Sequence, residues 1–136
     1  MVAESHLPVR QDGDIVLARQ AGRALAAEMG FSDVEQTVIA TAISEIARNV
    51  VEHAGWGEMH LSAIVQSGRR GIAIVARDEG PGISDIPRAM QDGFTTGRGL
   101  GMGLPGARRL MDEFEITSAP GRGTTVRMIK WRPARA

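Results

Sequence analysis

Two closely spaced groups of glycines constrain this sequence more than any other feature. The first, Asp78-Glu79-Gly80-Pro81-Gly82, follows the apolar run Gly71–Ala76, and the second, Gly99-Leu100-Gly101-Met102-Gly103, comes about twenty residues later. Because glycine has no Cβ, it can adopt positive φ and let backbone N–H groups approach phosphate oxygens that a larger residue would block. Asp78 is expected at a strand end, with its carboxylate facing whatever the loop holds. The pattern therefore favours a nucleotide-binding site.

The basic residues narrow the kind of nucleotide site. Lys130 is the single lysine among the 16 basic residues, so the other basic residues are all arginines. A P-loop needs a lysine after its glycines, and ordinary protein kinases need a strand lysine upstream of the catalytic loop. Both sites are excluded. A nucleotide held by this chain is expected to contact backbone groups, arginines and a metal ion.

Length and composition predict one domain over residues 1–136. Acidic and basic residues balance at 16 each, so no overall field attracts nucleic acid or anionic lipid. The chain has no cysteine, and its three histidines lack the spacing of a zinc site. No apolar run approaches the ~20 residues of a membrane span, and residues 1–11 do not resemble a leader peptide. These features favour a cytoplasmic protein without nucleic-acid or membrane partners.

Hydrophobic periodicity predicts an α/β fold with a mixed or mostly antiparallel sheet. Ser32-Asp33-Val34-Glu35 has the spacing of a capping box, which predicts a long helix over Asp33–His53. The regular βαβ alternation of a Rossmann fold is missing. The expected elements are a strand near 6–10, helices over 14–29, 33–53 and 101–111, strands over 58–66, 70–78, 114–118 and 124–131, and a loop over 79–99 with a helical turn near 86–90.

The helix over Asp33–His53 carries the candidate chemistry. Its isoleucines fall on one arc that faces the core, while Glu45 and Asn49, four residues apart, share a neighbouring face. An asparagine oxygen suits Mg²⁺, and a glutamate can accept a proton. Alone, such a pair is far more typical of a solvated helix flank than of a catalytic site. Its weight comes from the order of the motifs, because the two glycine groups and then Gly121-Arg122-Gly123-Thr124 follow it.

Together these motifs resemble the GHKL superfamily, the ATP-binding fold of histidine kinases, gyrase-type topoisomerases, heat-shock chaperones and mismatch-repair ATPases. Residues 42–54 resemble its N box, and Asp78–Gly82 and Gly99–Gly103 resemble its two glycine boxes. Residues 103–114 are similar to the RsbT-type serine/threonine kinases of partner-switching stress modules. The resemblance implies a two-layer α/β sandwich of the Bergerat type, with a mixed, mostly antiparallel sheet and helices on one face.

The resemblance also implies roles for individual residues. Asp78 hydrogen-bonds the adenine amino group, Thr124 completes the adenine contacts, Asn49 coordinates Mg²⁺, and Glu45 takes the proton from the incoming hydroxyl. Gly80 and Gly82 let the nucleotide lie against the loop. Residues 92–98 form a lid, in which Arg98 either neutralises a phosphate or only keeps the loop solvated. The remaining phosphate contacts come from the second glycine box: Gly99, Leu100, Gly101, Met102 and Gly103.

The function implied is a serine/threonine kinase that transfers the γ-phosphate of ATP to a regulatory partner. The expected partner is a STAS-domain anti-sigma-factor antagonist or a stressosome-type protein, with a phosphatase as a further candidate downstream. An alternative is an anti-sigma factor or switch protein that uses ATP to set its binding surface. An isolated histidine-kinase catalytic domain is less favoured, because no phosphoacceptor-helix pattern precedes the N box and the lid is short.

Overall fold

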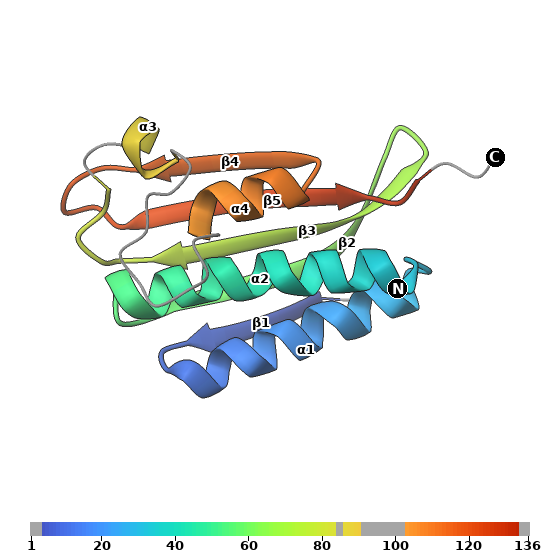
Figure 1. Ribbon diagram of the computed structural model, residues 1–136, viewed down its shortest axis with the longest axis horizontal. Helices are drawn as coiled ribbons and strands as arrows, with labels where there is room; N and C mark the ends of the chain where they lie inside the picture. Colours follow the sequence, from blue (N-terminus) through green and yellow to red (C-terminus); the bar gives the residue numbers. More distant parts are fainter. Residues whose placement is uncertain (1–3, 84–85, 91–102, 134–136) are drawn as a thin grey trace.

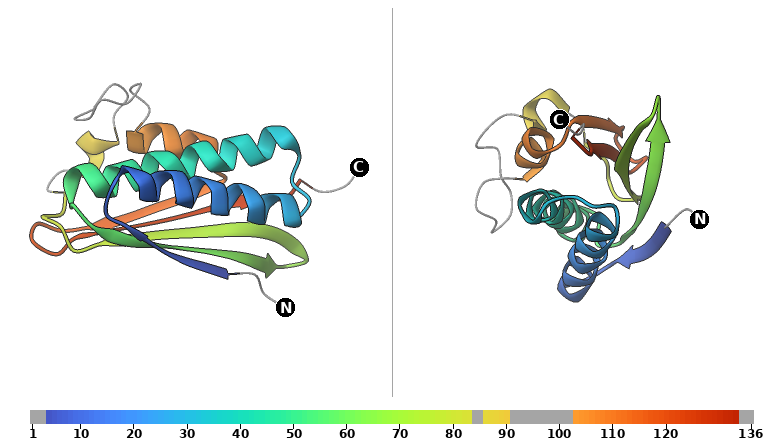
Figure 2. Two further views of the ribbon diagram at one scale, coloured as in Figure 1. Left: turned by 90° about the horizontal axis from the view of Figure 1, so that it is seen from below. Right: turned by 90° about the vertical axis from the view of Figure 1, so that its right-hand side faces the viewer.

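Three helices cover one face of an antiparallel sheet in the computed structural model, which describes residues 4–83, 86–90 and 103–133 (Figures 1 and 2). The sheet has the strand order β1-β2-β3-β5-β4. Helices α1, α2 and α4 lie side by side over it, with α2 in the middle. The elements are β1 (Glu4–Val9), α1 (Asp12–Glu28), α2 (Asp33–His53), β2 (Gly57–Gln66), β3 (Arg69–Asp78), α3 (Ile86–Ala89), α4 (Gly103–Leu110), β4 (Glu113–Ser118) and β5 (Thr124–Trp131).

The predicted two-layer sandwich with a mostly antiparallel sheet is confirmed. All four described strand pairings are antiparallel. Short turns join β2 to β3 and β4 to β5, and such turns reverse the direction of the chain, whereas parallel neighbours need long crossovers. The two hairpins therefore account for the antiparallel pairing of β2 with β3 and of β4 with β5.

The predicted helices are present with small shifts at their ends. The capping box of α2 is confirmed, since Glu35 N–H donates to Ser32 Oγ and Ser32 N–H donates to Glu35 Oε1, both at 3.1 Å. Helix α1 begins at Asp12, two residues earlier than predicted, with acidic Asp12 and Asp14 at its positive end. The expected start of the last helix at residue 101 and the lid at 92–98 lie outside the described residues.

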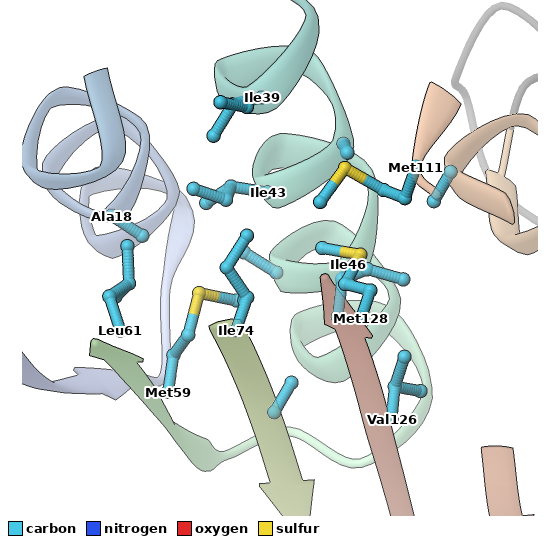
Figure 3. Close-up of a cluster of buried hydrophobic side chains, with 14 of the residues drawn as sticks. Ala18, Ile39, Ile43, Ile46, Met59, Leu61, Ile74, Met111, Val126 and Met128 are labelled. Atoms are coloured by element: carbon cyan, nitrogen blue, oxygen red, sulfur yellow. The ribbon is translucent and has the colours of Figure 1, made fainter. Parts of the chain in front are cut away.

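A single apolar core fills the space between the two layers. The α2 arc supplies Ile39, Ile43, Ile46 and Val50, all buried as predicted. Opposite them lie side chains from the inner face of the sheet, which Figure 3 shows pointing toward the layer of helices: Met59, Leu61, Ile74, Val126 and Met128. Met111, directly after α4, packs in the same core. Met111 and Met128 therefore fill the core, whereas Met102 lies outside the described residues.

At one end of the sheet the inner face changes from apolar to polar. The strand registers place Val9, Gly57, Asp78, Thr124 and Ser118 in one row across all five strands. Side chains alternate along a strand, so the row shares the inner face with the core residues two positions away. Asp78 and Thr124 are buried in this row, and Gly57 lets Val50 and Asp78 pack closely, because a Cβ on Gly57 would lie 2.8 Å from Val50 Cγ1 and 3.1 Å from Asp78 Cβ. On β3, β5 and β4 this row thus consists of hydrogen-bonding side chains.

Glycines allow neighbouring loops to close around this row. A Cβ on Gly123 would lie 2.1 Å from the carbonyl oxygen of Asp78, and one on Gly80 would lie 2.6 Å from Ala54 Cβ. A Cβ on Gly82, whose φ is +79°, would lie 2.0 Å from the carbonyl oxygen of Ala119. These glycines are therefore needed for contacts within the protein itself, in addition to any approach by a ligand.

Two glycines of the β4–β5 turn allow a test of the close approach between this turn and the backbone of Asp78. Gly121 and Gly123 have nearly the same φ, +74° and +75°, but a Cβ on Gly121 meets nothing within 4 Å. In both Gly121→Ala and Gly123→Ala the left-handed backbone costs about 1–2 kcal/mol. The clash with Asp78 adds to this cost only in Gly123→Ala, so urea unfolding is expected to show a clearly larger loss there. Equal losses in the two variants would contradict the close approach.

Candidate functional site

The carboxylate of Asp78 is fixed by two backbone N–H groups. Its Oδ1 atom accepts hydrogen bonds from Gly80 N–H at 2.9 Å and from Thr124 N–H at 3.2 Å. The Asp78 residue is 8% exposed. Within the described residues no group donates to Oδ2 of Asp78. The second oxygen therefore remains an oriented acceptor for a ligand that carries an N–H group.

Thr124 and Ser118 continue the polar row beyond Asp78. The Thr124 hydroxyl lies 2.8 Å from Ser118 Oγ. Ser118 Oγ also accepts from Ile83 N–H at 2.7 Å and donates to the Gly123 carbonyl at 2.9 Å. Ser118 thus connects the loop after β3 to the β4–β5 turn. Sequence reasoning missed Ser118, although its place two residues after Ile116 on the inner face of β4 was a usable signal.

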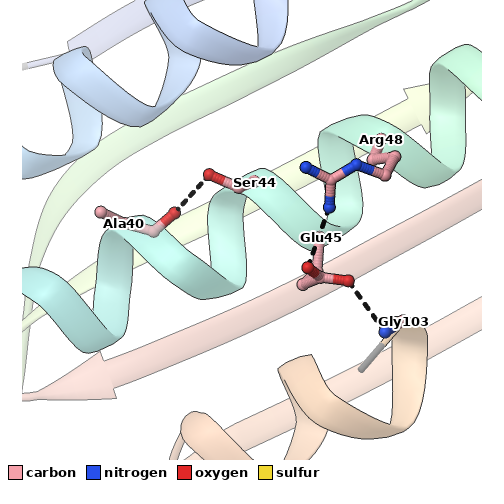
Figure 4. A network of polar contacts seen from close by, with 5 residues as sticks. All are labelled: Ala40, Ser44, Glu45, Arg48 and Gly103. Atoms are coloured by element: carbon pink, nitrogen blue, oxygen red, sulfur yellow. Dashed lines mark hydrogen bonds and ion pairs between the residues drawn. The ribbon is translucent and has the colours of Figure 1, made fainter. Parts of the chain in front are cut away.

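Glu45 lies between α2 and the beginning of α4 (Figure 4). Its Oε2 atom accepts from Gly103 N–H at 2.8 Å, and its Oε1 atom accepts from Arg48 Nη1 at 2.9 Å. The Glu45 side chain is 12% exposed and the Arg48 side chain 34%. A carboxylate at a helix N-terminus is stabilised by the helix dipole. Glu45 is therefore a fixed anion at the end of α4, an arrangement that the spacing of Glu45 and Asn49 alone did not predict.

Asn49 follows Glu45 by one helical turn and is partly exposed. Its carboxamide makes no hydrogen bond with the part of the chain that the structure describes. A neutral amide oxygen that has no protein partner is chemically suited to a hard cation such as Mg²⁺. By contrast, the Ser44 hydroxyl is buried on the same helix and donates to the Ala40 carbonyl at 2.9 Å (Figure 4).

The structure places the predicted residues in two groups along α2. Asp78, Gly80, Gly82 and Thr124 surround the end of the sheet, where Gly80 contacts Ala54 just after α2. Glu45, Asn49 and Gly103 lie along α2 toward α4. The remaining candidates lie outside the described residues: Arg98, Gly99, Leu100, Gly101 and Met102. The described part of the site is thus a sheet end lined by acceptors and a helix pair that carries the fixed carboxylate.

A depression of about 530 Å³ lies at the opposite end of the sheet, near the start of α2. Its lining mixes acidic and basic side chains, and several of them already interact. Lys130 Nζ lies 3.5 Å from Asp112 Oδ1, and Trp131 Nε1 donates to Glu113. This region contains none of the predicted site residues.

Among the described helices, none combines the length and the apolar character needed to cross a bilayer.

Comparisons with known proteins agree with this fold. Residues 7–130 match the family described as histidine kinase-like ATPase domain. The M. tuberculosis crystal structure of RsbU and RsbW domains gives a TM-score of 0.63 at 24% identity, covering 99% of this chain and 34% of that one. The mycobacterial sensor histidine kinase MprB gives 0.55 at 18% identity, with 96% and 100% covered. At these identities both structures support the fold alone.

Two curated relatives are more similar in sequence. Serine/threonine-protein kinase RsbT of Bacillus subtilis is 49% identical over 128 residues, which cover 94% of this chain and 96% of the relative. An anti-sigma F factor of Thermoanaerobacter is 40% identical over 119 residues, with 84% and 82% covered. The motifs, the fold and these comparisons agree: the chain belongs to the histidine kinase-like ATPase family, as a member similar to RsbT-type kinases and anti-sigma F factors.

Proposed function

We propose that this chain is a protein serine/threonine kinase that phosphorylates a regulatory partner in a partner-switching stress module. The observation that carries the proposal is the Glu45 carboxylate, which is held between Arg48 and the first N–H of α4. A positioned carboxylate beside a helix N-terminus combines a proton acceptor with an anion-binding helix end. The 49% identity to a serine/threonine-protein kinase supports the same activity.

The adenine amino group is the proposed ligand of Asp78. Oδ1 of Asp78 is occupied by two backbone N–H groups, so Oδ2 accepts from the amine. Thr124 lies beside Asp78 in the same row and is proposed to complete the contacts with the adenine. The phosphates then extend along α2 toward the N-terminus of α4, where backbone N–H groups bind anions.

Phosphoryl transfer requires a base close to the acceptor hydroxyl. In the proposed step the serine or threonine oxygen of the partner attacks the γ-phosphorus, and its proton passes to Glu45. The bond between the γ-phosphorus and the β–γ bridging oxygen breaks, so ADP leaves with that electron pair. Asn49 would hold Mg²⁺ through its carboxamide oxygen, and the ion would supply positive charge against the phosphates. Arg98 and residues 99–103 complete the proposed phosphate site.

The proposed protein substrate is a STAS-domain anti-sigma-factor antagonist or a stressosome-type protein, and a downstream phosphatase is a further proposed partner. The setting is the cytoplasm, where ATP and such partners meet. A second candidate function is an ATP-dependent anti-sigma or switch protein with little kinase activity. The 40% identity to an anti-sigma F factor favours it. The two functions differ in whether phosphate reaches the partner.

A transfer assay with γ-labelled ATP, Mg²⁺ and a purified STAS-domain anti-sigma-factor antagonist separates the two functions. Labelled partner is expected with the wild type. Glu45→Gln keeps an oxygen for Gly103 but removes the base, so transfer is expected to fall by about 10²–10⁴-fold while ATP affinity stays nearly constant. Partner that binds but remains unlabelled contradicts the kinase and favours the switch protein.

Asp78→Asn is the matched variant for nucleotide binding. The asparagine oxygen can keep the two backbone hydrogen bonds, which turns its NH₂ group toward the adenine amine. Two donors then face each other, and ATP affinity measured by calorimetry is expected to fall by about tenfold or more. If Asp78→Asn and Glu45→Gln reduced ATP affinity equally, the proposed division of roles would be wrong.

The Mg²⁺ role of Asn49 is tested by comparing ATP affinity with and without the metal. Asn49→Ala is expected to remove most of the gain in affinity that Mg²⁺ gives, and to leave binding in excess EDTA unchanged. Thr41→Ala is the control, because Thr41 lies on the same helix and its hydroxyl donates to the Thr37 carbonyl. An Asn49→Ala protein with the full Mg²⁺ gain would refute the assignment.

A further inference from the structure

We infer that Ser118 determines base specificity in the proposed nucleotide site by fixing the direction of the Thr124 hydroxyl. This inference rests on the proposed function, because it concerns the base that lies against Asp78 and Thr124. It begins with the row across the sheet, in which Asp78, Thr124 and Ser118 are direct neighbours on β3, β5 and β4. All three side chains share the inner face of the sheet.

The hydrogen bonds of Ser118 leave one arrangement of protons. A serine hydroxyl has one proton and two lone pairs. Ile83 N–H can only donate to Ser118 Oγ, at 2.7 Å, and the Gly123 carbonyl can only accept from it, at 2.9 Å. The Ser118 proton is therefore used on Gly123, and the 2.8 Å contact with Thr124 Oγ1 must be donated by Thr124.

Because the Thr124 hydroxyl donates to Ser118, Asp78 and Thr124 both present only hydrogen-bond acceptors to a ligand. The Thr124 proton is committed to Ser118, so only oxygen lone pairs of Thr124 remain for a ligand. Oδ2 of Asp78 is also an acceptor, since Oδ1 takes the two backbone N–H groups. Directly opposed residues on neighbouring antiparallel strands have Cβ atoms about 4.5–5.5 Å apart. Two acceptors at this spacing suit the two N–H bonds of one exocyclic amine.

A base that carries a carbonyl group in place of the amine would set its oxygen against the acceptor oxygens of Asp78 and Thr124. A site built to hydrogen-bond one polar group strongly rejects the analogue that lacks it, because the polar groups of the site are then left unpaired. Both acceptors are shielded from water, since Asp78 is 8% and Thr124 6% exposed. Ser118 thereby discriminates a 6-aminopurine nucleotide from a 6-oxopurine nucleotide without touching either.

The test compares the affinities of ATP and inosine triphosphate, which differ at position 6 of the purine. The wild type is expected to prefer ATP by about 10²-fold or more. In Ser118→Ala the Thr124 proton is free to turn toward the ligand, so the preference is expected to fall about tenfold. Ser118→Thr retains a hydroxyl and is expected to restore the preference. Thr117→Ala, on the exposed outer face of β4, serves as the control.

Ser118→Ala also leaves Ile83 N–H and the Gly123 carbonyl without their partner, so its folding is checked by thermal unfolding. Thr124→Val provides a second variant, because it removes the acceptor and is likewise expected to lower the preference for ATP. If both variants weakened the two nucleotides equally, Ser118 would be merely structural and the inference overturned. Unchanged discrimination in both variants would overturn it too. A wild type that binds neither nucleotide would instead refute the proposed function.

Discussion

The fixed carboxylate of Asp78 is the interaction on which the end of the sheet depends. One oxygen accepts two backbone N–H groups from segments that are distant in sequence, the loop after β3 and the start of β5. Such bonds form only if the turns approach closely, and Gly80 and Gly123 allow that approach because a Cβ on either would clash. The same geometry leaves the other Asp78 oxygen for a ligand. Packing and recognition therefore share one set of residues.

Glu45 likewise combines a structural contact with a proposed role in the reaction, at the helical side of the site. Its carboxylate bonds the first N–H of α4, at a helix end where an anion is favourable. Arg48 holds the other oxygen, so the side chain keeps a defined place beside α2. In the proposed kinase, phosphate and carboxylate lie near the same helix end. The base is then close to the group whose transfer it assists, and both depend on the contact between α2 and α4.

Local patterns in the sequence predicted much of the fold. The capping box at Ser32 and the isoleucine arc of α2 identified that helix and its buried face, since both signals act within a few residues. Alternation and turn residues placed the strands, but the order of the strands in the sheet was not predicted, because it is decided by tertiary connections. The glycine motifs indicated a nucleotide site. They did not reveal that Gly80 and Gly82 are also required by contacts with Ala54 and Ala119. Ser118 and Arg48 were missed, because their meaning depends on neighbours across the sheet and along α2.

In the proposed kinase a nucleotide lies between Asp78 and the N-terminus of α4. The most direct measurement is the change in backbone amide NMR signals when ATP and Mg²⁺ are added to the ¹⁵N-labelled wild type. The largest shifts are expected at Gly80, Thr124 and Gly103, whose N–H groups donate to Asp78 and Glu45. Gly68, in the distant β2–β3 turn, is expected to stay unchanged. Shifts that were confined to the opposite depression near Glu35 and Asp112, or no shifts at all, would contradict the account.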